Sequence, residues 1–285
     1  DKGGVCLNYM KVNCLLKDAA GKINGVHAVD TLDGKEYQIK SKVVVNATGV
    51  FVDDVMKMDE CDTRRKVRPS QGVHLVVDRK FLGGRSALMI PKTKDGRVLF
   101  GVPWHGKVVL GTTDTPLNEA SLEPRALEEE VDFILDQAGQ YLDRKPTRAD
   151  VLSIFAGLRP LAAPTHADSK KTKEISRNHK IYRSKSGLLT ITGGKWTTYR
   201  AMAEDVINQA IAIGGLSPAE CVTKNLRVHG YTKEQFDEND WNYVYGSDAS
   251  KIQKMIEKEP SFAEKLYEGY TFTAAHVVWA VREEF

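Results

Sequence analysis

The sequence has 285 residues, of which 41% are hydrophobic and 28% are charged, a composition typical of a soluble globular protein with room for two domains. Its 41 Lys and Arg against 38 Asp and Glu leave a net charge of only +3, so no global positive field indicates nucleic acid as a partner. No apolar run approaches the ~20 residues that span a bilayer, and the scattered cysteines form no CxxC pair, so the sequence predicts no transmembrane helix, metal site or disulfide framework.

Short β-prone runs occupy the beginning of the chain, and turns at Ala20-Gly21 and Asp33-Gly34 predict a meander of tight hairpins. The runs are residues 12–17, 25–30, 37–40 and 43–45. The last of them, Val43-Val44-Val45, is uniformly apolar, which predicts a strand buried on both faces, as in a parallel sheet. The small residues Ala47-Thr48-Gly49 follow, and they suit either a simple tight turn or the close approach of a ligand to backbone N–H groups.

A second strand-and-turn region extends from about residue 66 to residue 115. Its expected strands are residues 73–77, 87–91, 98–102 and 108–110. Pro124 then predicts the start of a helix, because apolar residues recur at steps of three and four from Leu127 to Leu142.

Two further strands are expected at residues 175–183 and 188–192, followed by a helix that Gly193-Gly194 open and Gly214-Gly215 end. Polar, helix-prone segments then predict a domain boundary near residue 216. These segments are residues 232–245, 249–258, 261–268 and 272–284.

The Gly193-Gly194 pair and the hydroxyls after it, including Thr197, stand where a helix is expected to begin. Free N–H groups and the positive end of the helix dipole favour an anion or an electron-rich ring edge there. Lys195 in the first turn would oppose that dipole, which favours an anionic ligand over an ordinary glycine turn with a threonine cap.

Three more residues suggest chemistry but allow a structural interpretation. Arg159 lies among apolar neighbours and needs a partner, either a structural carboxylate, which is slightly favoured, or an anionic ligand. His74 is expected on the strand face opposite to its apolar neighbours, as a satisfied polar residue or a general base. Thr113, within Gly111 to Thr115, suits turn capping or the polar wall of a site.

The basic run from Lys170 to Lys185 suits a solvated loop or, as a lesser alternative, contact with anionic lipid headgroups.

Several motifs occur in one order along the chain: VVVNATG, RPSQGVHLV, FGVPW, GTTDT, GLRPL and TGGKWTTYR. Over residues 1–215 this order resembles the FAD-dependent glycerol-3-phosphate dehydrogenases, which belong to the D-amino-acid-oxidase-like flavoprotein group. The tail ending in HVVWAVREEF resembles the helical carboxyl-terminal domain of the same enzymes.

The resemblance implies an α+β and α/β architecture. It assigns residues 1–62 to the FAD-binding domain, 63–192 to a substrate domain with a mixed or antiparallel sheet, 193–216 to a helix returning to the FAD-binding domain, and 217–285 to the helical domain. It also implies hydride transfer from C2 of sn-glycerol 3-phosphate to flavin N5, with dihydroxyacetone phosphate as product and quinone as the electron acceptor.

The resemblance further implies roles for individual residues. His74, Arg159 and Lys195 would be catalytic and would contact substrate together with Thr113. The residues expected against FAD are Ala47, Thr48, Gly49, Gly193, Gly194, Lys195 and Thr197.

The GxGxxG fingerprint of the family is absent from this sequence, so we expect a fragment of a longer enzyme that by itself binds FAD poorly and is inactive. A cytoplasmic enzyme is expected, with a possible peripheral position on the inner face of the membrane and a possible homodimer. Two alternatives remain open, a glycerophosphate oxidase that uses O2 and a non-catalytic interaction module.

Overall fold

The computed structural model describes residues 3–94, 96–163, 178–235 and 240–284. The chain divides into two compact units, Asp1–Cys221 and Val222–Phe285. This division lies a few residues beyond the boundary expected near residue 216. No helix among the described residues is long and apolar enough to cross a membrane.

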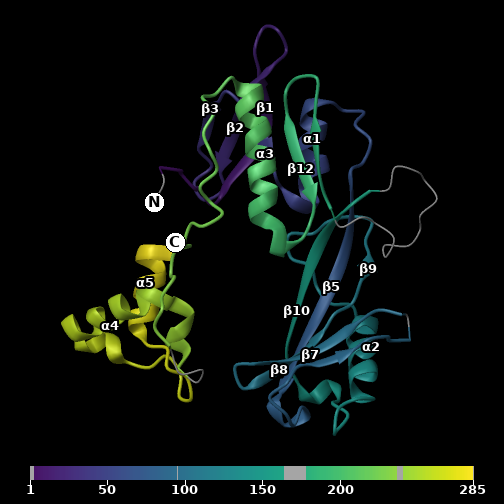
Figure 1. The fold of residues 1–285 in the computed structure, drawn as a ribbon, viewed down its shortest axis with the longest axis vertical. Helices are drawn as coiled ribbons and strands as arrows, with labels where there is room; N and C mark the ends of the chain where they lie inside the picture. The colour runs from purple at the N-terminus through teal and green to yellow at the C-terminus, as the bar shows by residue number, and fades with distance from the viewer. Residues whose placement is uncertain (1–2, 95, 164–177, 236–239, 285) are drawn as a thin grey trace. The chain divides into compact units, whose positions relative to one another are not determined.

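The first unit begins with an antiparallel sheet in the order β1-β2-β3 (Figure 1). Its strands are β1 (Met10–Lys17), β2 (Ile23–Asp30) and β3 (Glu36–Lys40). The turns contain Gly21 and Gly34 at φ +73° and +74°, values that suit glycine. The meander is confirmed for the first three of the four expected runs, whereas Val45 belongs to a strand of another sheet. The helix α1 (Val52–Asp59), which the sequence patterns did not indicate, packs against this sheet through Met56.

A second, three-stranded sheet has the order β11-β12-β4. It consists of β4 (Val45–Asn46), β11 (His179–Arg183) and β12 (Leu189–Gly193). The strand β4 pairs in parallel with β12, as expected for a parallel sheet, but Val43 to Val45 are not buried on both faces. These valines are only half-buried because β4 is a two-residue strand at the sheet edge. Since β11 and β12 pair in this sheet, residues 179–193 do not belong to the substrate sheet, contrary to the expected range of 63–192.

The third sheet of this unit has six strands in the order β10-β5-β8-β7-β6, with β9 paired to β5, and every pairing is antiparallel. Its strands are β5 (Val67–Asp78), β6 (Leu88–Ile90), β7 (Leu99–Trp104), β8 (Lys107–Gly111), β9 (Thr115–Pro116) and β10 (Val151–Ala162). The sequence predicted four of them and missed β9 and β10. The strand β10 contains Pro160, which lacks an N–H group but is tolerated because β10 is an edge strand.

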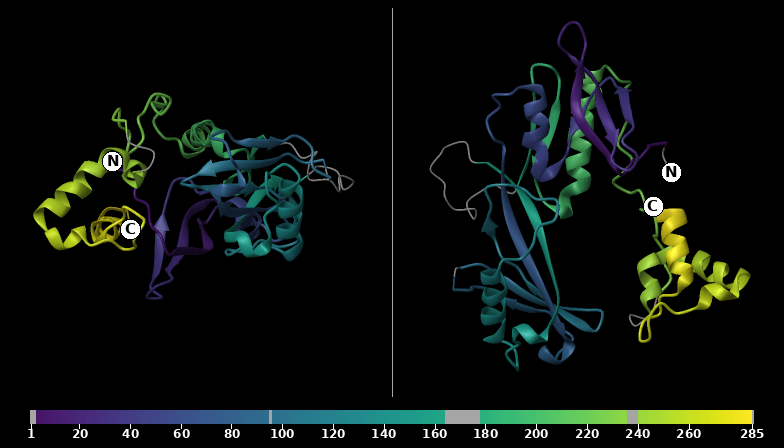
Figure 2. Two further views of the ribbon diagram at one scale, coloured as in Figure 1. Left: turned by 90° about the horizontal axis from the view of Figure 1, so that it is seen from below. Right: turned by 180° about the vertical axis from the view of Figure 1, so that it is seen from behind.

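The helix α2 (Glu128–Gly139) covers one face of this six-stranded sheet (Figure 2). Val73, Leu75 and Val77 of β5 are fully buried beneath it in the main hydrophobic core. The helix begins at Glu128 and not at Pro124, because the extended residue Leu127 donates its N–H to the Glu130 carboxylate at 2.9 Å and so fixes the first turn there.

The helix α3 (Tyr199–Gly214) packs on the three-stranded sheet β11-β12-β4 through Val206 and Ala210. It ends as predicted, because Gly215 adopts a left-handed conformation at φ +57°. Its start differs from the prediction, since a short 3-10 helix, η5 (Trp196–Thr198), separates it from the glycine pair. Lys195 therefore precedes the helical turns and does not lie in the first turn of α3.

The described residues of the same unit also form the 3-10 turns η1 (Gly49–Phe51), η2 (Arg79–Phe81) and η3 (Arg148–Asp150). The first of them, η1, contacts β5, β10 and β12.

The second unit is helical, with Ile252, Ala275 and Trp279 in its core. Its elements are η6 (Trp241–Asp248), α4 (Ala249–Lys258), η7 (Pro260–Ala263), α5 (Ala274–Trp279) and the π-helical η8 (Ala280–Glu284). The helices expected at 249–258 and 272–284 are confirmed, whereas 261–268 contains only the end of a 3-10 turn. For the helix expected at 232–245, the described helical residues begin at 241, and residues 236–239 lie outside the described part.

Candidate active site

Two turns that the sequence indicated as cofactor contacts lie side by side in the structure. The strands β4 and β12 run parallel, with Val45 opposite Leu189 and Asn46 opposite Thr190. Because the carboxyl ends of parallel strands meet at one edge of a sheet, the segments 47–49 and 193–195 emerge together. Contact between β12 and η1 agrees with this placement.

Asn46 joins these two strands to the helix behind them. Its buried side-chain amide donates to the carbonyl oxygen of Val52 at 2.9 Å and to the hydroxyl of Thr190 at 3.3 Å. The Asn46 side-chain oxygen accepts a hydrogen bond from the Thr48 hydroxyl at 2.8 Å. Asn46 therefore fixes the turn at Ala47 to Gly49, while Ala47 and Thr48 themselves are exposed.

The second turn requires both of its glycines. Gly193 and Gly194 have φ values of +78° and +81°. A Cβ on Gly193 would lie 2.9 Å from the Asn178 carbonyl oxygen, and one on Gly194 would overlap the Met202 sulfur. Larger residues would therefore be strained by backbone conformation and by space.

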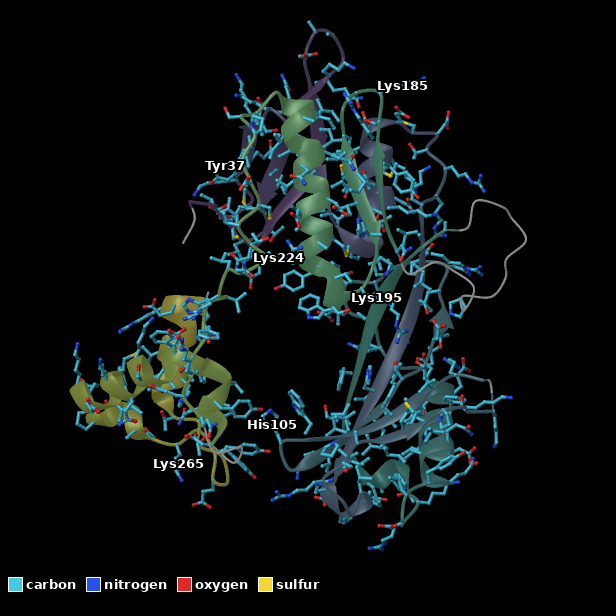
Figure 3. The ribbon with its side chains drawn as sticks, in the orientation of Figure 1. Tyr37, His105, Lys185, Lys195, Lys224 and Lys265 are labelled. Carbon is cyan, nitrogen blue, oxygen red and sulfur yellow. The ribbon has the colours of Figure 1, made fainter. Side chains whose placement is uncertain are left out.

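Lys195 follows this turn, where the chain passes from β12 to α3, and its side chain is exposed (Figure 3). Thr198 closes the turn by donating its hydroxyl to the Lys195 carbonyl at 3.0 Å. Thr197, which the resemblance assigns to the cofactor, is exposed.

The residues of these turns suit a flavin. Small residues leave the backbone accessible at the end of two parallel strands, and Gly49 also has a positive φ of +62°. The hydroxyl of Thr192 is buried next to the glycine pair and has no hydrogen-bond partner among the described residues. Burying an unpaired hydroxyl costs about 1–3 kcal/mol, so Thr192 fits a site where a further polar group binds.

The six-stranded sheet meets the same two turns through its strand β10. Ala162 is the last residue of β10. Its Cβ atom lies 3.8 Å from the position that a Cβ on Gly193 would take. The strand β10 also contacts β12 and η1. The carboxyl end of β10 therefore lies beside the second turn. We call the face that carries His74, Gly72 and Arg159 the open face, and the face beneath α2 the covered face.

Arg159 lies on the open face and is held by the turn after β8. Its guanidinium donates to the Thr113 carbonyl oxygen at 3.1 Å and to the Thr112 hydroxyl at 3.0 Å. It stands 3.9 Å from the carboxylate of Asp114, which in turn accepts a hydrogen bond from Ser70. A Cβ on Gly72 would overlap the guanidinium, so this glycine makes room for it. Arg159 thus has the structural carboxylate that the sequence allowed, yet its side chain remains 34% exposed.

His74 lies two residues beyond Gly72 on the same strand face, roughly 7 Å along β5. Its neighbours Val73 and Leu75 are fully buried on the covered face, so the orientation predicted for His74 is confirmed. Burial, and secondarily the positive charge of Arg159, lower the pKa of His74 below its usual 6.5. The imidazole is therefore neutral near pH 7 and is able to accept a proton.

Thr113 does not form a wall of the site, which corrects the expectation that it binds substrate. Its side chain is buried, donates to the Glu130 carboxylate at 2.8 Å and accepts the Val73 N–H at 3.0 Å. Only its carbonyl oxygen reaches the site, where it holds Arg159.

Sequence reasoning missed Glu130, whose carboxylate holds the side chain of Thr113 in place. Besides Thr113 and the Leu127 N–H, its buried carboxylate accepts hydrogen bonds from Gln71 at 2.7 Å and Thr115 at 2.6 Å. Burial acts to raise the pKa of Glu130, but these hydrogen bonds outweigh it and lower the pKa below 4.5. The only sequence signal was a glutamate three residues after the residue that precedes the helix, the spacing of a capping box.

Apolar residues flank His74 across the open face. The cross-strand row through His74 runs from Met89 and Phe100 through Gly111 to Phe155. Met89, Phe100 and Phe155 are all exposed. A polar pair, His74 and Arg159, therefore lies beside an apolar sheet surface, an arrangement typical of ligand sites.

Fold and site together are those of a flavin-dependent oxidoreductase. The family model for FAD-dependent oxidoreductases matches residues 1–200, and the chain belongs to this family. The chain is 39% identical over 314 residues to the mitochondrial glycerol-3-phosphate dehydrogenase SDP6 of Arabidopsis thaliana, covering 99% of this chain and 49% of that protein. It is 36% identical over 307 residues to the mitochondrial glycerol-3-phosphate dehydrogenase of Homo sapiens, covering 99% and 42%.

Solved structures agree with these relatives. The glycerol-3-phosphate dehydrogenase of Bacillus halodurans complexed with FAD superimposes with a TM-score of 0.80 at 32% identity, over 96% of this chain and 57% of that chain. The L-alpha-glycerophosphate oxidase of Mycoplasma pneumoniae, at 14% identity and a TM-score of 0.52, shares the fold. The resemblance drawn from the motifs is confirmed, and the chain spans about half the length of the curated relatives it matches.

Proposed function

We propose that the complete protein to which this chain belongs uses FAD to oxidise sn-glycerol 3-phosphate to dihydroxyacetone phosphate. The names of the plant, human and bacterial relatives support this substrate. One structural observation carries the proposal: His74 and the guanidinium of Arg159 are neighbours on the open face, and the strand β10 that carries Arg159 ends beside the turns that suit a flavin.

The turns at Ala47 to Gly49 and at Gly193 to Lys195 would hold the cofactor. FAD, when bound, supplies the acceptor for the hydride that leaves C2 of the substrate. Lys195 adds a positive charge beside the turn, which suits the negative charge that a flavin gains on reduction.

His74 would take the proton of the C2 hydroxyl as hydride leaves the carbon, because a half-buried neutral imidazole is a suitable base near pH 7. Arg159 presents a planar set of donors, which suits either the phosphate group or the oxygen of the developing carbonyl. The anchors at Thr112 and Thr113 fix the direction of that guanidinium before substrate arrives. The apolar residues of the open face would exclude water from the bound substrate.

Quinone is the electron acceptor that we propose, with O2 as the alternative. The likeness to the Mycoplasma oxidase concerns the fold and does not favour either acceptor. Peripheral contact with the inner face of a membrane, a cytoplasmic site of action and a homodimer complete the proposal. The plant and human relatives are named as mitochondrial proteins, so fractionation of the source cells would test the location.

The test uses the complete purified protein. Under anaerobic conditions, sn-glycerol 3-phosphate should bleach the flavin absorbance, whereas glycerol without its phosphate should bleach it far more slowly. A quinone analogue should then restore the absorbance. Rapid peroxide formation in air would favour the oxidase, and a flavin that no concentration of glycerol 3-phosphate reduces would contradict the proposal.

A further inference from the structure

The imidazole of His74 rests against an aromatic ring that no sequence motif indicated. Phe155 lies opposite His74 on the neighbouring strand β10, and the two rings stack with centroids 4.9 Å apart and planes inclined by 11°. This near-parallel geometry covers one side of the imidazole and restricts its rotation.

The other cross-strand neighbour of His74 is Gly111 of β8. A Cβ at this position would overlap the imidazole ring, so the ring occupies the space that a side chain would fill. Phe155 on one side and Gly111 on the other therefore define a single place for the imidazole on the open face.

Packing of the hydrophobic core does not account for Phe155. Phe155 is 49% exposed, and it lies on the face opposite to Leu75 and the covered core. Its neighbour Ile154 is 46% exposed but pairs with Leu75, so it lies on the other face of the same strand.

We propose that Phe155 is a positioning residue for His74, whose phenyl ring holds the imidazole over Gly111 in the orientation needed to take a proton from the substrate. This inference rests on the proposed function. It extends that function, because it assigns the geometry of the base to a residue of β10 four positions before Arg159.

The pKa of His74 can be measured with few neighbouring charges acting on it. Arg159 of β10 is the charged group that acts on its pKa, and β8 presents Gly111, which has no side chain. Asp78 and Lys107 lie four residues further along β5 and β8 and pair with each other at 3.6 Å. Burial and the positive charge of Arg159 both lower the pKa of His74.

The first test follows the histidine itself in the complete protein labelled with ¹³C-histidine, with His74→Asn used to assign its signal. Phe155→Ala uncovers one side of the imidazole, so the pKa of His74 should rise towards its ordinary value, and Phe155→Tyr should restore the original titration. Ile154→Ala, which removes a similar apolar side chain from the other face of β10, should leave it unchanged. A titration that Phe155→Ala does not move would overturn the proposal even if the protein has another substrate.

The second test is turnover of glycerol 3-phosphate. Phe155→Ala should lower kcat by roughly tenfold to a hundredfold with little change in KM, as expected for a misplaced base, and Phe155→Tyr should recover most of that loss. Phe155→Leu, with flavin content and circular dichroism as folding controls, serves if the alanine variant is unstable. Wild-type kcat and an unchanged pH profile in a folded Phe155→Leu or Phe155→Ala protein would contradict the role. Absence of turnover in the wild-type protein would contradict the proposed function alone.

Discussion

The two faces of the six-stranded sheet come from the same strands but have different compositions. On the covered face, Val73, Leu75 and Val77 of β5 are fully buried under α2. On the open face, the alternate residues of the same strand include Ser70, Gly72 and His74. Because side chains alternate along a strand, one segment supplies the hydrophobic core and also places the polar residues of the candidate site.

The same strands provide a rigid core on one face and the polar residues of the candidate site on the other. The residues of the open face do not hold the sheet together, so they are free to be polar, small or exposed. The position of His74 is nonetheless fixed, because it lies between the core residues Val73 and Leu75 on the same strand. Substitutions on the two faces should therefore have separable effects, on turnover for one face and on stability for the other.

The largest effect is expected on the open face. His74→Asn in the complete protein should lower turnover by about 10²- to 10⁴-fold, the usual contribution of a general base, while flavin content and melting temperature change little. Steady-state assays with a dye acceptor and flavin absorbance measure both quantities. Normal turnover in this variant would remove His74 as the base.

The adjacent residue tests the covered face. Leu75→Ala should lower the free energy of unfolding by about 2–5 kcal/mol, because it leaves a cavity in the core. The reaction rate per folded molecule should stay near that of the wild type. Val76→Ala, at a half-buried position on the open face, should cost clearly less in urea unfolding than Val77→Ala, the same truncation on the covered face. Equal losses at both positions would mean that the two faces are not separate in this way.

A smaller effect is expected where the two faces are linked. Glu130→Gln should cost about 1–3 kcal/mol, because a buried carboxylate that accepts several hydrogen bonds is replaced by an amide that cannot accept them all.

The pKa of Glu130 is lowered in the folded state, so its contribution to stability is complete above the unfolded value of 4.5 and is lost as the pH falls below it. Chemical unfolding at pH 7 and at pH 3 should show the difference between wild type and variant shrink at the lower pH. A difference that is constant or larger at pH 3 would argue against the ionised carboxylate as the cause.

The smallest effect concerns pH. Because burial lowers the pKa of His74, its neutral form persists below pH 6.5. The acid limb of kcat/KM for glycerol 3-phosphate should therefore have a midpoint below 6.5, with activity falling only under that pH. A midpoint above 6.5 would indicate a different titrating group or a more exposed imidazole.

Sequence reasoning found the local features and missed those that depend on pairing across the chain. The glycine pair at 193–194 and the outward orientation of His74 are visible in residue type and in alternation. The strand β10 was not, because Gly157 and Pro160 obscure its pattern, and without β10 neither the stack of Phe155 on His74 nor the placement of Arg159 over Gly72 can be inferred.

The role assigned to Thr113 failed for a related reason. A threonine in a turn beside an aspartate suits a binding site and a buried network equally well. The structure shows the buried network, because the carboxylate of Glu130, 17 residues away, accepts a hydrogen bond from the Thr113 hydroxyl. Such a contact depends on how α2 packs on the sheet, which no local pattern specifies.

The six-stranded sheet interrupts a different sheet, since β4 precedes it, β12 follows it, and those two strands are neighbours. Val67 at the start of the insertion pairs with Ala162 at the end of β10, so the chain departs and returns through adjacent residues. An insertion attached in this way can be exchanged as a module without disturbing the register of the strands that flank it. Replacement of the segment between Lys66 and Ala163 could therefore change the substrate while the turns proposed to bind the flavin stay the same.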